Sequence, residues 1–169
     1  MGSYNAADGT QSWPTGEVAP DGSLWVLYVD GQTDAASETV SNTLRLFRST
    51  DHGSTWSERN ITPQPGRYQY RWLSVSPDGR QLGFDIYFRP NASSDWHVYG
   101  SIFGRSGKPT LVLLDPVSVQ DRHCADAPGD LLGSAFNPDG TLSAMWTRNT
   151  DPTTCGLVTV RDIYFARSL

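Results

Sequence analysis

Apolar and polar residues alternate over short runs along this chain, and no stretch of helix length repeats its apolar residues with a period of 3.6. The clearest alternating runs cover residues 43–48, 97–102 and 162–167. Because successive side chains of a β-strand point to opposite faces, this pattern predicts half-buried strands. Glycine (16 residues) and proline (11 residues) are frequent, whereas only 18% of residues are charged. We therefore expect an all-β protein with many tight turns.

Three Pro-Asp-Gly triplets divide the chain into repeats. They begin at Pro20, Pro77 and Pro138, which lie 57 and 61 residues apart. Proline presets φ for a turn and glycine allows a positive φ, so each triplet predicts a hairpin turn between two apolar strands. A period of this size with four strands per repeat is typical of propeller blades. We expect outer strands near residues 57–61 and 111–114.

The stretch from Ser49 to Trp56 fits the pattern Ser-x-Asp-x-Gly-x-Thr-Trp, with Ser49, Asp51, Gly53, Thr55 and Trp56 at the fixed positions. It resembles the Asp-box, the bacterial neuraminidase repeat of sialidase-like β-propellers. The resemblance implies a hairpin turn that Asp51 and Gly53 close, with Trp56 packed between blades. It implies an architecture rather than an activity, and a structural role for the five residues.

The triplets and the resemblance together predict one domain with about three four-stranded antiparallel blades of a sialidase-like propeller. Propellers usually have four to eight blades, so we expect this chain to be half of a six-bladed ring. It is then either a piece of a larger propeller or a half that assembles with a second copy. The expected bounds are residues 15–62 for blade one, 72–115 for blade two and 131–169 for blade three.

Both ends of the chain suggest blades that are out of phase. The spacing from Asp8 to Trp13 equals that from Asp51 to Trp56, so residues 1–14 are expected to form the outer strand of a preceding or partner blade. Ser168 aligns with Ser49, and blade three therefore lacks its outer strand. A partner sheet would close it.

The two cysteines are expected on one face of the blades. In a four-stranded blade, the Pro-Asp-Gly turns share one face with the Asp-box turn, and the longer loops 115–130 and 147–160 lie on the opposite face. These loops carry Cys124 and Cys155, which 30 residues separate. A disulfide between them would stabilise the fold by roughly 3–4 kcal/mol and indicates a secreted or periplasmic protein. Two independent thiols are the alternative.

The loop before blade three gathers ionisable side chains on the same face. They are Asp121, Arg122, His123, Asp126 and Asp130. Such a loop can position a carboxylate and an arginine for a sugar or anion, or offer oxygen ligands to a cation. The alternative is a solvated loop held by its cysteine. The spacing matches no zinc site, and we predict neither a metal nor a cofactor.

Two further places on this face suit a sugar ligand. Arg71 and Trp72 end a segment rich in aromatic residues and arginines, and flat rings beside guanidinium groups are common on sugar-binding surfaces. Alternatively, these rings pack between blades and the arginines cover them. Arg148 follows an apolar strand and could point into the central funnel, or lie on the surface.

The resemblance to sialidases implies catalytic residues that this chain does not supply in full. That family uses three arginines, a tyrosine paired with a glutamate, an aspartate acid/base and an Arg-Ile-Pro motif. Arg71, Arg122 and Arg148 could imitate two members of the arginine triad, but the sequence has no Arg-Ile-Pro motif and only three glutamates. The catalytic residues stay unknown, and sialidase activity is not predicted for this chain alone.

Charge and hydropathy narrow the possible partners. The net charge is −5, with one lysine and no basic cluster, which argues against nucleic acid. No run approaches 18 apolar residues, which argues against a membrane partner. We expect an extracytoplasmic module that binds a glycan or another ligand on its funnel face. The alternatives are a glycoside hydrolase half, whose active site a missing or partner half completes, and a protein-interaction scaffold.

Overall fold

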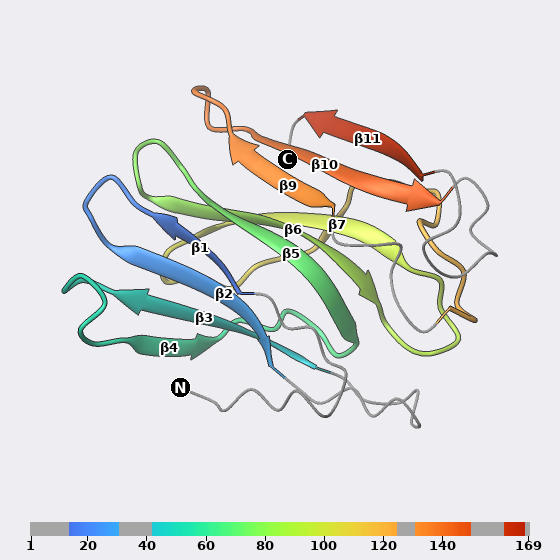
Figure 1. The fold of residues 1–169 in the computed structure, drawn as a ribbon, viewed down its shortest axis with the longest axis horizontal. Coiled ribbons are helices and arrows are strands. Elements are labelled where there is room, and N and C mark those ends of the chain that lie inside the picture. Colours follow the sequence, from blue (N-terminus) through green and yellow to red (C-terminus); the bar gives the residue numbers. More distant parts are fainter. Residues whose placement is uncertain (1–13, 31–41, 125–130, 150–160, 168–169) are drawn as a thin grey trace.

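The computed structural model of the chain describes residues 14–30, 42–124, 131–149 and 161–167. These residues form eleven strands and no α-helix, which confirms the all-β prediction. The strands make three antiparallel sheets that lie side by side (Figure 1). The first sheet contains β1 (Thr15–Val18), β2 (Leu24–Asp30), β3 (Thr43–Ser49) and β4 (Ser57–Asn60). The second contains β5 (Arg67–Val75), β6 (Gln81–Arg89), β7 (His97–Gly104) and β8 (Val112–Leu113), and the third contains β9 (Leu132–Phe136), β10 (Leu142–Asn149) and β11 (Arg161–Arg167).

Each sheet is a meander in which every strand pairs with the next along the chain. The first strands of the three sheets, β1, β5 and β9, are neighbours, so they form the inner side of the arrangement. β3, β7 and β11 contain the three alternating runs, and β4 and β8 lie where outer strands are predicted. β5 begins at Arg67, five residues before the expected start of blade two. Residues 1–13, expected to form an outer strand, lie outside the described part of the chain.

Each Pro-Asp-Gly triplet forms the predicted hairpin turn. Its glycine has a positive φ of 79° at Gly22, 70° at Gly79 and 85° at Gly140, which other residues rarely adopt. The aspartate Oδ1 accepts the backbone N–H two residues on, at 3.0–3.1 Å. A nearby serine or threonine hydroxyl donates to the same oxygen at 2.6 Å. Local chemistry alone therefore closes these turns.

The second of these turns is one residue longer than the other two. Its closing hydrogen bond joins Ser76 N–H to the Gln81 carbonyl, five residues on. In the first and third turns, the closing bond spans four residues, from Ala19 to Ser23 and from Asn137 to Thr141. Residues of the second strands, β2, β6 and β10, therefore correspond to one another when they are numbered from the last residue of each turn, which is Ser23, Gln81 or Thr141.

Counted in this way, Leu27 of β2, Asp85 of β6 and Met145 of β10 occupy equivalent positions. Leu27 packs in the apolar core between the first and second sheets. Asp85 points from the second sheet toward the third, because its neighbours Phe84 and Ile86 point into the core with the first sheet and successive side chains alternate between faces. The Leu27 and Asp85 side chains therefore each point toward the sheet that follows their own along the chain.

Two apolar cores hold the three sheets together. The first joins the first two sheets and includes Leu27, Leu46 and Phe84. The second joins the second and third sheets and includes Tyr87 and Trp146. Exposure of these five side chains is at most 3%. Burial of such side chains between sheets is the main force that keeps the sheets in contact.

Polar contacts add to the packing of the first two sheets near the turns. Arg105 of the second sheet forms an ion pair with Asp21, with Nη1 2.6 Å from Oδ2. Its guanidinium also lies 5.5 Å from the centre of the Trp25 ring, and Arg48 lies 5.1 Å from the same ring. Arg59 Nη2 donates to the Arg105 carbonyl at 2.5 Å. Arg59 and Arg105 thus connect the first two sheets at the end that carries the Pro-Asp-Gly turns.

The Ser49–Trp56 segment forms a compact turn between β3 and β4. Asp51 Oδ1 accepts the Thr55 N–H at 2.8 Å, and Asp51 Oδ2 accepts the Thr55 hydroxyl at 2.6 Å. Ser49 Oγ donates to Asp51 Oδ1 and accepts the Gly53 N–H, both at 2.8 Å. Gly53 has a φ of 89°, and the half-buried Trp56 donates its indole N–H to the Gly53 carbonyl at 3.0 Å. All five pattern residues therefore take part in the turn.

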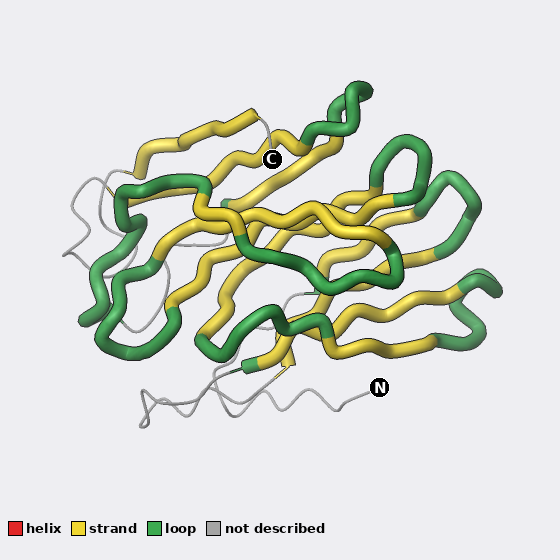
Figure 2. Tube along the Cα trace, turned by 180° about the vertical axis from the view of Figure 1, so that it is seen from behind, coloured by secondary structure: helices red, strands yellow, loops and turns green. Residues whose placement is uncertain are grey.

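The connections of the sheets lie at two opposite ends. The Pro-Asp-Gly turns and the Ser49–Trp56 turn gather at one end, on the left and upper left of Figure 1. The connections from β4 to β5, from β6 to β7 and from β8 to β9 reach the other end, which we call the loop face, and Figure 2 shows the same division from behind. Among the described elements, no helix has the length and apolar character needed to cross a membrane.

Candidate functional site

The inner strand β5 is irregular where it reaches the loop face. Its register against β6 shifts between Gln69 and Arg71, which marks a β-bulge at Tyr70. Tyr70 has a φ of 42°, in the left-handed region that non-glycine residues seldom occupy. Its ring packs edge-on against Tyr87, with centroids 6.3 Å apart. The bulge re-aims the next two residues, Arg71 and Trp72, and such strain is common at functional sites.

Arg71 is a buried cation that lacks full pairing. Its side chain lies on the face of β5 turned toward the first sheet, and the residue is only 5% exposed. Nε and Nη2 are buried and make no hydrogen bond. Burial lowers the pKa of the guanidinium to about 10, and the nearby Tyr28 opposes this effect. A buried charge without partners is costly, so this guanidinium is suited to receive an anion or ligand hydroxyl groups.

Trp72 follows Arg71 and is 45% exposed, although it lies on an inner strand. It pairs with Asp85 of β6, so both residues are on the side of the second sheet that faces the third. The Trp72 carbonyl accepts a long hydrogen bond from Ser134 Oγ of β9, at 3.5 Å. Its backbone is therefore fixed while part of the indole stays accessible, as a stacking surface for a sugar requires.

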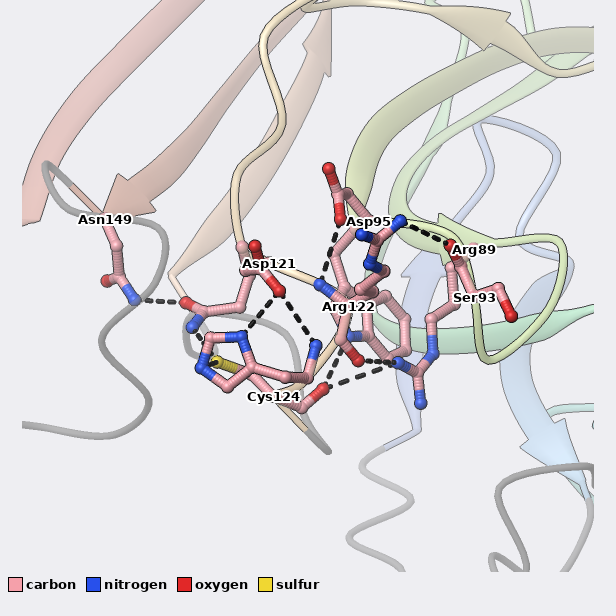
Figure 3. A network of polar contacts seen from close by, with 10 residues as sticks. Arg89, Ser93, Asp95, Asp121, Arg122, Cys124 and Asn149 are labelled. Carbon is pink, nitrogen blue, oxygen red and sulfur yellow. Dashed lines mark hydrogen bonds and ion pairs between the residues drawn. The ribbon is translucent and has the colours of Figure 1, made fainter.

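The segment after β8 carries Asp121, Arg122 and Cys124, whose polar contacts Figure 3 shows. It pairs with the loop between β6 and β7, where Trp96 N–H donates to the Gln120 carbonyl and Val119 N–H donates to the Trp96 carbonyl, each at 2.8 Å. Arg122 N–H donates to Asp95 Oδ1 at 3.0 Å, and Arg122 Nη1 lies 3.5 Å from the Ser93 carbonyl. This part of the loop is therefore ordered by hydrogen bonds.

Asp121 and His123 form a close pair on this segment. Asp121 Oδ1 accepts the His123 N–H at 2.9 Å and lies 2.5 Å from His123 Nδ1. The His123 N–H, the imidazole and the charge of Arg122 lower the pKa of the Asp121 carboxyl. Both side chains are accessible, with exposures of 30% and 54%. The pair closes a local turn and leaves the imidazole at the surface.

Arg89 is a buried residue that donates hydrogen bonds to this segment, and it is not among the residues that the sequence suggested. It is 2% exposed, and its Nη1 donates to the carbonyls of Arg122 at 3.0 Å and Cys124 at 3.4 Å. Its guanidinium lies 4.7 Å from the centre of the Trp96 ring, which itself is fully buried. The available signal was an arginine that ends an apolar strand directly before Pro90.

Cys124 lies inside the same network. It is 2% exposed, and Gln120 Nε2 is 2.6 Å from its sulfur. Asn149 at the end of β10 donates to Gln120 Oε1, which connects the segment to the third sheet. Cys155, Asp126 and Asp130 lie outside the described residues, so the Cys124–Cys155 bridge and the roles of both aspartates stay predictions.

Arg148 does not point toward the inner strands, contrary to one of the two sequence expectations. Its Nη1 lies 3.2 Å from Asp115 Oδ2, and its Nη2 lies 2.5 Å from the Tyr164 hydroxyl. The guanidinium stacks 3.8 Å from the centre of the Tyr164 ring. Asp115 also accepts the Trp146 indole N–H at 3.3 Å. Tyr164 lies on β11, which is the strand of the third sheet farthest from the inner strand β9. Arg148 therefore links Asp115 and Tyr164 in the outer part of the fold.

The candidate residues thus separate into two groups. Arg71 and Trp72 belong to the inner strand β5, whereas Asp121, Arg122 and His123 belong to the segment that Arg89 and Trp96 support. Within the described ranges, no three His, Cys, Asp or Glu side chains are arranged to hold a metal ion. The first group combines a buried cation with two unbonded nitrogens and, on the opposite face of β5, a partly accessible ring.

No model of a known protein family matches this chain. Among solved structures, it is similar to an alpha-L-arabinanase of Penicillium chrysogenum complexed with arabinobiose, with 15% identity and a TM-score of 0.59 over 92% of this chain and 45% of that one. A Hadza microbial sialidase, Hz136, has 15% identity and a TM-score of 0.57 over 90% of this chain and 34% of that one.

A third similar structure is the GH93 alpha-L-arabinofuranosidase of Fusarium graminearum with arabinobiose. Its identity is 15% and its TM-score 0.53, over 87% of this chain and 41% of that one. The chain therefore spans about a third to a half of the length of these proteins. At this identity the likeness concerns the fold. The chain has the all-β fold of part of a propeller, of the kind found in sialidases and related glycoside hydrolases.

Proposed function

We propose that this chain is a module of an extracytoplasmic β-propeller that binds a glycan at the loop-face end of its inner strands. The single observation that carries the proposal is Arg71, a guanidinium that is 5% exposed, with Nε and Nη2 making no hydrogen bond. Trp72 beside it supplies an accessible indole. Guanidinium groups bind carboxylates and vicinal hydroxyls, and indoles cover the apolar face of a sugar ring. Because the two side chains leave β5 on opposite faces, we propose that they contact different parts of a ligand lying across this inner strand.

Five of the described carboxylates are already engaged by other groups of the chain, which supports binding rather than self-contained catalysis. Asp51, Asp21 and Asp78 close turns at the end opposite to the loop face. Asp115 is bound to Arg148 and Trp146, and Asp121 to His123. A glycosidase needs two carboxyl groups about 5–10 Å apart across the glycosidic bond. In the single copy, each of these five carboxylates is held by a partner within this chain, so a catalytic pair would need a carboxyl group from elsewhere.

The same proposal assigns the Ser49–Trp56 turn to the Asp-box class. The pattern residues all take part in its hydrogen bonds, and the turn lies at the end opposite to Arg71 and Trp72. Asp51 is accordingly proposed to form the turn and not to contact the ligand. A location outside the cytoplasm follows in the proposal from the predicted Cys124–Cys155 bridge, since such bridges persist in oxidising compartments.

The binding proposal is tested by titrating the protein with N-acetylneuraminic acid as an anionic sugar and arabinobiose as a neutral one, using calorimetry. We expect binding of at least one sugar that Arg71→Met abolishes and that Trp72→Ala weakens at least tenfold. Val112→Glu on the exposed outer strand β8 serves as the control and should leave the affinity unchanged. Binding that survives Arg71→Met would contradict the assigned subsite.

A second candidate is a glycoside hydrolase half. It is favoured by the likeness to three carbohydrate-active proteins, of whose length this chain spans 34–45%. In that case the remaining catalytic residues come from a missing or partner half, with Asp121, Asp126 or Asp130 contributed by this chain. Hydrolysis of chromogenic arabinofuranosides and sialosides by the assembled protein, lost in an Asp121→Asn variant, would favour this candidate over binding alone.

A further inference from the structure

The third sheet has an apolar face that no described part of the chain covers. Met145 of β10 is 46% exposed, and Ile163 and Phe165 of β11 are 70% and 66% exposed. Met145 pairs directly with Phe165 on one side and with Gly133 on the other, so they form a row across the sheet. Alternate residues of β10, such as Trp146, point the other way into the core with the second sheet. We call Met145, Ile163 and Phe165 the leading face.

The positions of the leading face are used for sheet packing elsewhere in the chain. Met145 is the equivalent of Leu27, which is fully buried where the first sheet meets the second. The equivalent residue of the second sheet, Asp85, is likewise fully buried, on the face opposite to Phe84 and Ile86 and therefore toward the third sheet. Of the three equivalent positions, Leu27 and Asp85 are therefore buried against the next sheet, whereas Met145 is half exposed. The leading face thus occupies the position of a surface that packs on a further sheet.

The first sheet carries the complementary face. In the second and third sheets, the surface that meets the preceding sheet is formed by Phe84 and Ile86 and by Ala144 and Trp146. In step with these, the first sheet presents Val26 and Tyr28, both half buried.

Neighbours extend this surface of the first sheet. Val26 pairs with Phe47 of β3, and Val18, at 64% exposure, pairs with Leu24 at the turn end. We call Val18, Val26 and Phe47 the trailing face. It is the one surface of this type that neither internal interface of the described sheets uses.

We propose that the leading face of one copy of this chain packs on the trailing face of a second copy. The contact would repeat the geometry by which the first sheet meets the second and the second meets the third. It joins two different surfaces, so it is heterologous, and it closes when the rotation per sheet completes a ring. Two copies would supply six sheets, a number within the usual range for propellers.

The assembly would also complete the proposed ligand site, although it does not depend on which ligand binds. In a single copy, the inner strands β1, β5 and β9 line only part of a funnel. In the two-copy ring, the inner strand β5, which carries Arg71 and Trp72, would face the inner strands of the partner across the axis. A ring of two copies would thus present two such subsites, and the partner would enclose the ligand.

The proposal is tested by light scattering coupled to size-exclusion chromatography on the 169-residue chain, with native mass spectrometry. The expected mass is twice the 18.6 kDa of one chain. Phe165→Glu on the leading face and Val18→Glu on the trailing face should each reduce the mass to that of one chain. Both side chains are exposed in the single copy, so folding should be preserved, which circular dichroism checks.

Mixing the two variants is the decisive experiment. One interface of the mixed pair carries both substitutions, whereas the other interface is unaltered, so the mixture should recover the mass of two chains. Val112→Glu, at a valine of 48% exposure outside both faces, is the matched control and should leave the mass of two chains unchanged. A single-chain mass for the unaltered protein overturns the proposal. So does association that Val18→Glu leaves intact, because leading faces would then contact each other, and so does loss of association in the control.

Discussion

Asp85 occupies in the second sheet the position that Leu27 occupies in the first. Both side chains are fully buried between sheets, but one is an aliphatic group and the other an ionisable carboxyl. The two Asp85 oxygens make no hydrogen bond of normal geometry, although the Ser134 hydroxyl and the Gly133 N–H lie near enough to favour the charged form. Desolvation outweighs them and raises the pKa of Asp85 from 3.8 to about 7. The interface of the second and third sheets therefore contains a carboxyl that prefers to be neutral.

The first prediction concerns the pH dependence of stability. The folded pKa of Asp85 lies above the unfolded value, so its folded state holds its proton more tightly. The free energy of unfolding should therefore fall as the pH rises from about 4 through about 7, by up to about 4 kcal/mol. Asp85→Asn should remove this fall and should exceed the native protein in stability at pH 8. Urea unfolding at pH 5 and pH 8 measures both effects.

Asp115→Asn is the control for this prediction. The Asp115 carboxylate is hydrogen-bonded to Arg148, Trp146 and the Val117 N–H, so its neutralisation should destabilise the protein at both pH values. If the native protein were equally stable at pH 5 and pH 8, ionisation of Asp85 would cost little free energy in the folded state, and the raised pKa of Asp85 would be wrong.

The second prediction contrasts two buried arginines. Arg71 has two guanidinium nitrogens without hydrogen bonds, whereas Arg89 binds the carbonyls of Arg122 and Cys124 and stacks on Trp96. Replacing even a buried ion pair by apolar side chains of similar volume is often neutral or stabilising by about 1–4 kcal/mol, and a buried charge without full pairing is costlier to keep. Arg71→Met should therefore raise the free energy of unfolding by about 1–3 kcal/mol.

Arg89→Met should have the opposite effect, because it removes the Arg89 donor from the Arg122 carbonyl and one of the two donors to the Cys124 carbonyl, and it also removes the stacking on Trp96. We expect a loss of about 2–4 kcal/mol. Chemical unfolding of both variants at pH 7 gives the comparison. If Arg71→Met is as destabilising as Arg89→Met, Arg71 is part of the structural framework, and its proposed role as a ligand group fails.

Much of this fold could be predicted because its signals are local. The alternating runs at residues 43–48, 97–102 and 162–167 coincide with β3, β7 and β11, and each Pro-Asp-Gly triplet forms a turn with its own side chains. The pattern from Ser49 to Trp56 contains every donor and acceptor of its turn. Where the groups that determine a structure are within a few residues of each other, sequence reasoning succeeds.

The remaining features depend on contacts between sheets. A sequence alignment on the three triplets makes Phe84 the equivalent of Leu27, whereas the structure makes Asp85 the equivalent. The difference is the extra residue in the second turn, which only its hydrogen bonds reveal. Arg148 was a candidate for the funnel because nothing near it in sequence reveals Asp115, 33 residues away, or Tyr164. The role of Arg89 likewise depends on carbonyls more than 30 residues away. Such long-range partners have no signature in a single sequence.

The third prediction concerns the turn at the end opposite to the loop face. Hydrogen bonds from the Thr55 hydroxyl, the Thr55 N–H and Ser49 lower the pKa of Asp51 to about 2. The stabilisation is therefore present above the unfolded pKa of 3.8 and is lost as the pH falls through about 2. Asp51→Asn should lower the Tm at pH 7 by several degrees, and this difference should shrink as the pH falls from 4 toward 2. Sugar binding should not change.

Ser54→Ala is the matched control for Asp51→Asn. Ser54 is an exposed residue of the same turn and contributes to it through its backbone N–H, so removal of its hydroxyl should leave the Tm within about a degree of the native value. A Tm that is equally lowered in both variants would mean that the turn responds to any substitution. Loss of sugar binding in Asp51→Asn would place the ligand at the wrong end of the propeller.

The last prediction concerns Cys124, whose surroundings suit a fixed covalent anchor. The residue is 2% exposed, and its carbonyl accepts hydrogen bonds from Arg89 and from the Trp96 indole, at 3.4 Å each. A bridge to Cys155 would tie this ordered segment to the connection between β10 and β11. Closing a loop of this length should stabilise the protein by roughly 3–4 kcal/mol. Denaturant unfolding with and without reductant measures the difference.

Thiol titration of the denatured, unreduced protein should find no reactive group, and a non-reducing gel should show a single chain, which separates an internal bridge from one between copies. The Cys124→Ser, Cys155→Ser double variant should unfold at the same denaturant concentration with and without reductant. Two reactive thiols in the unreduced protein would contradict the bridge. They would also remove the main support for a location outside the cytoplasm, because no other feature of the described chain indicates a compartment.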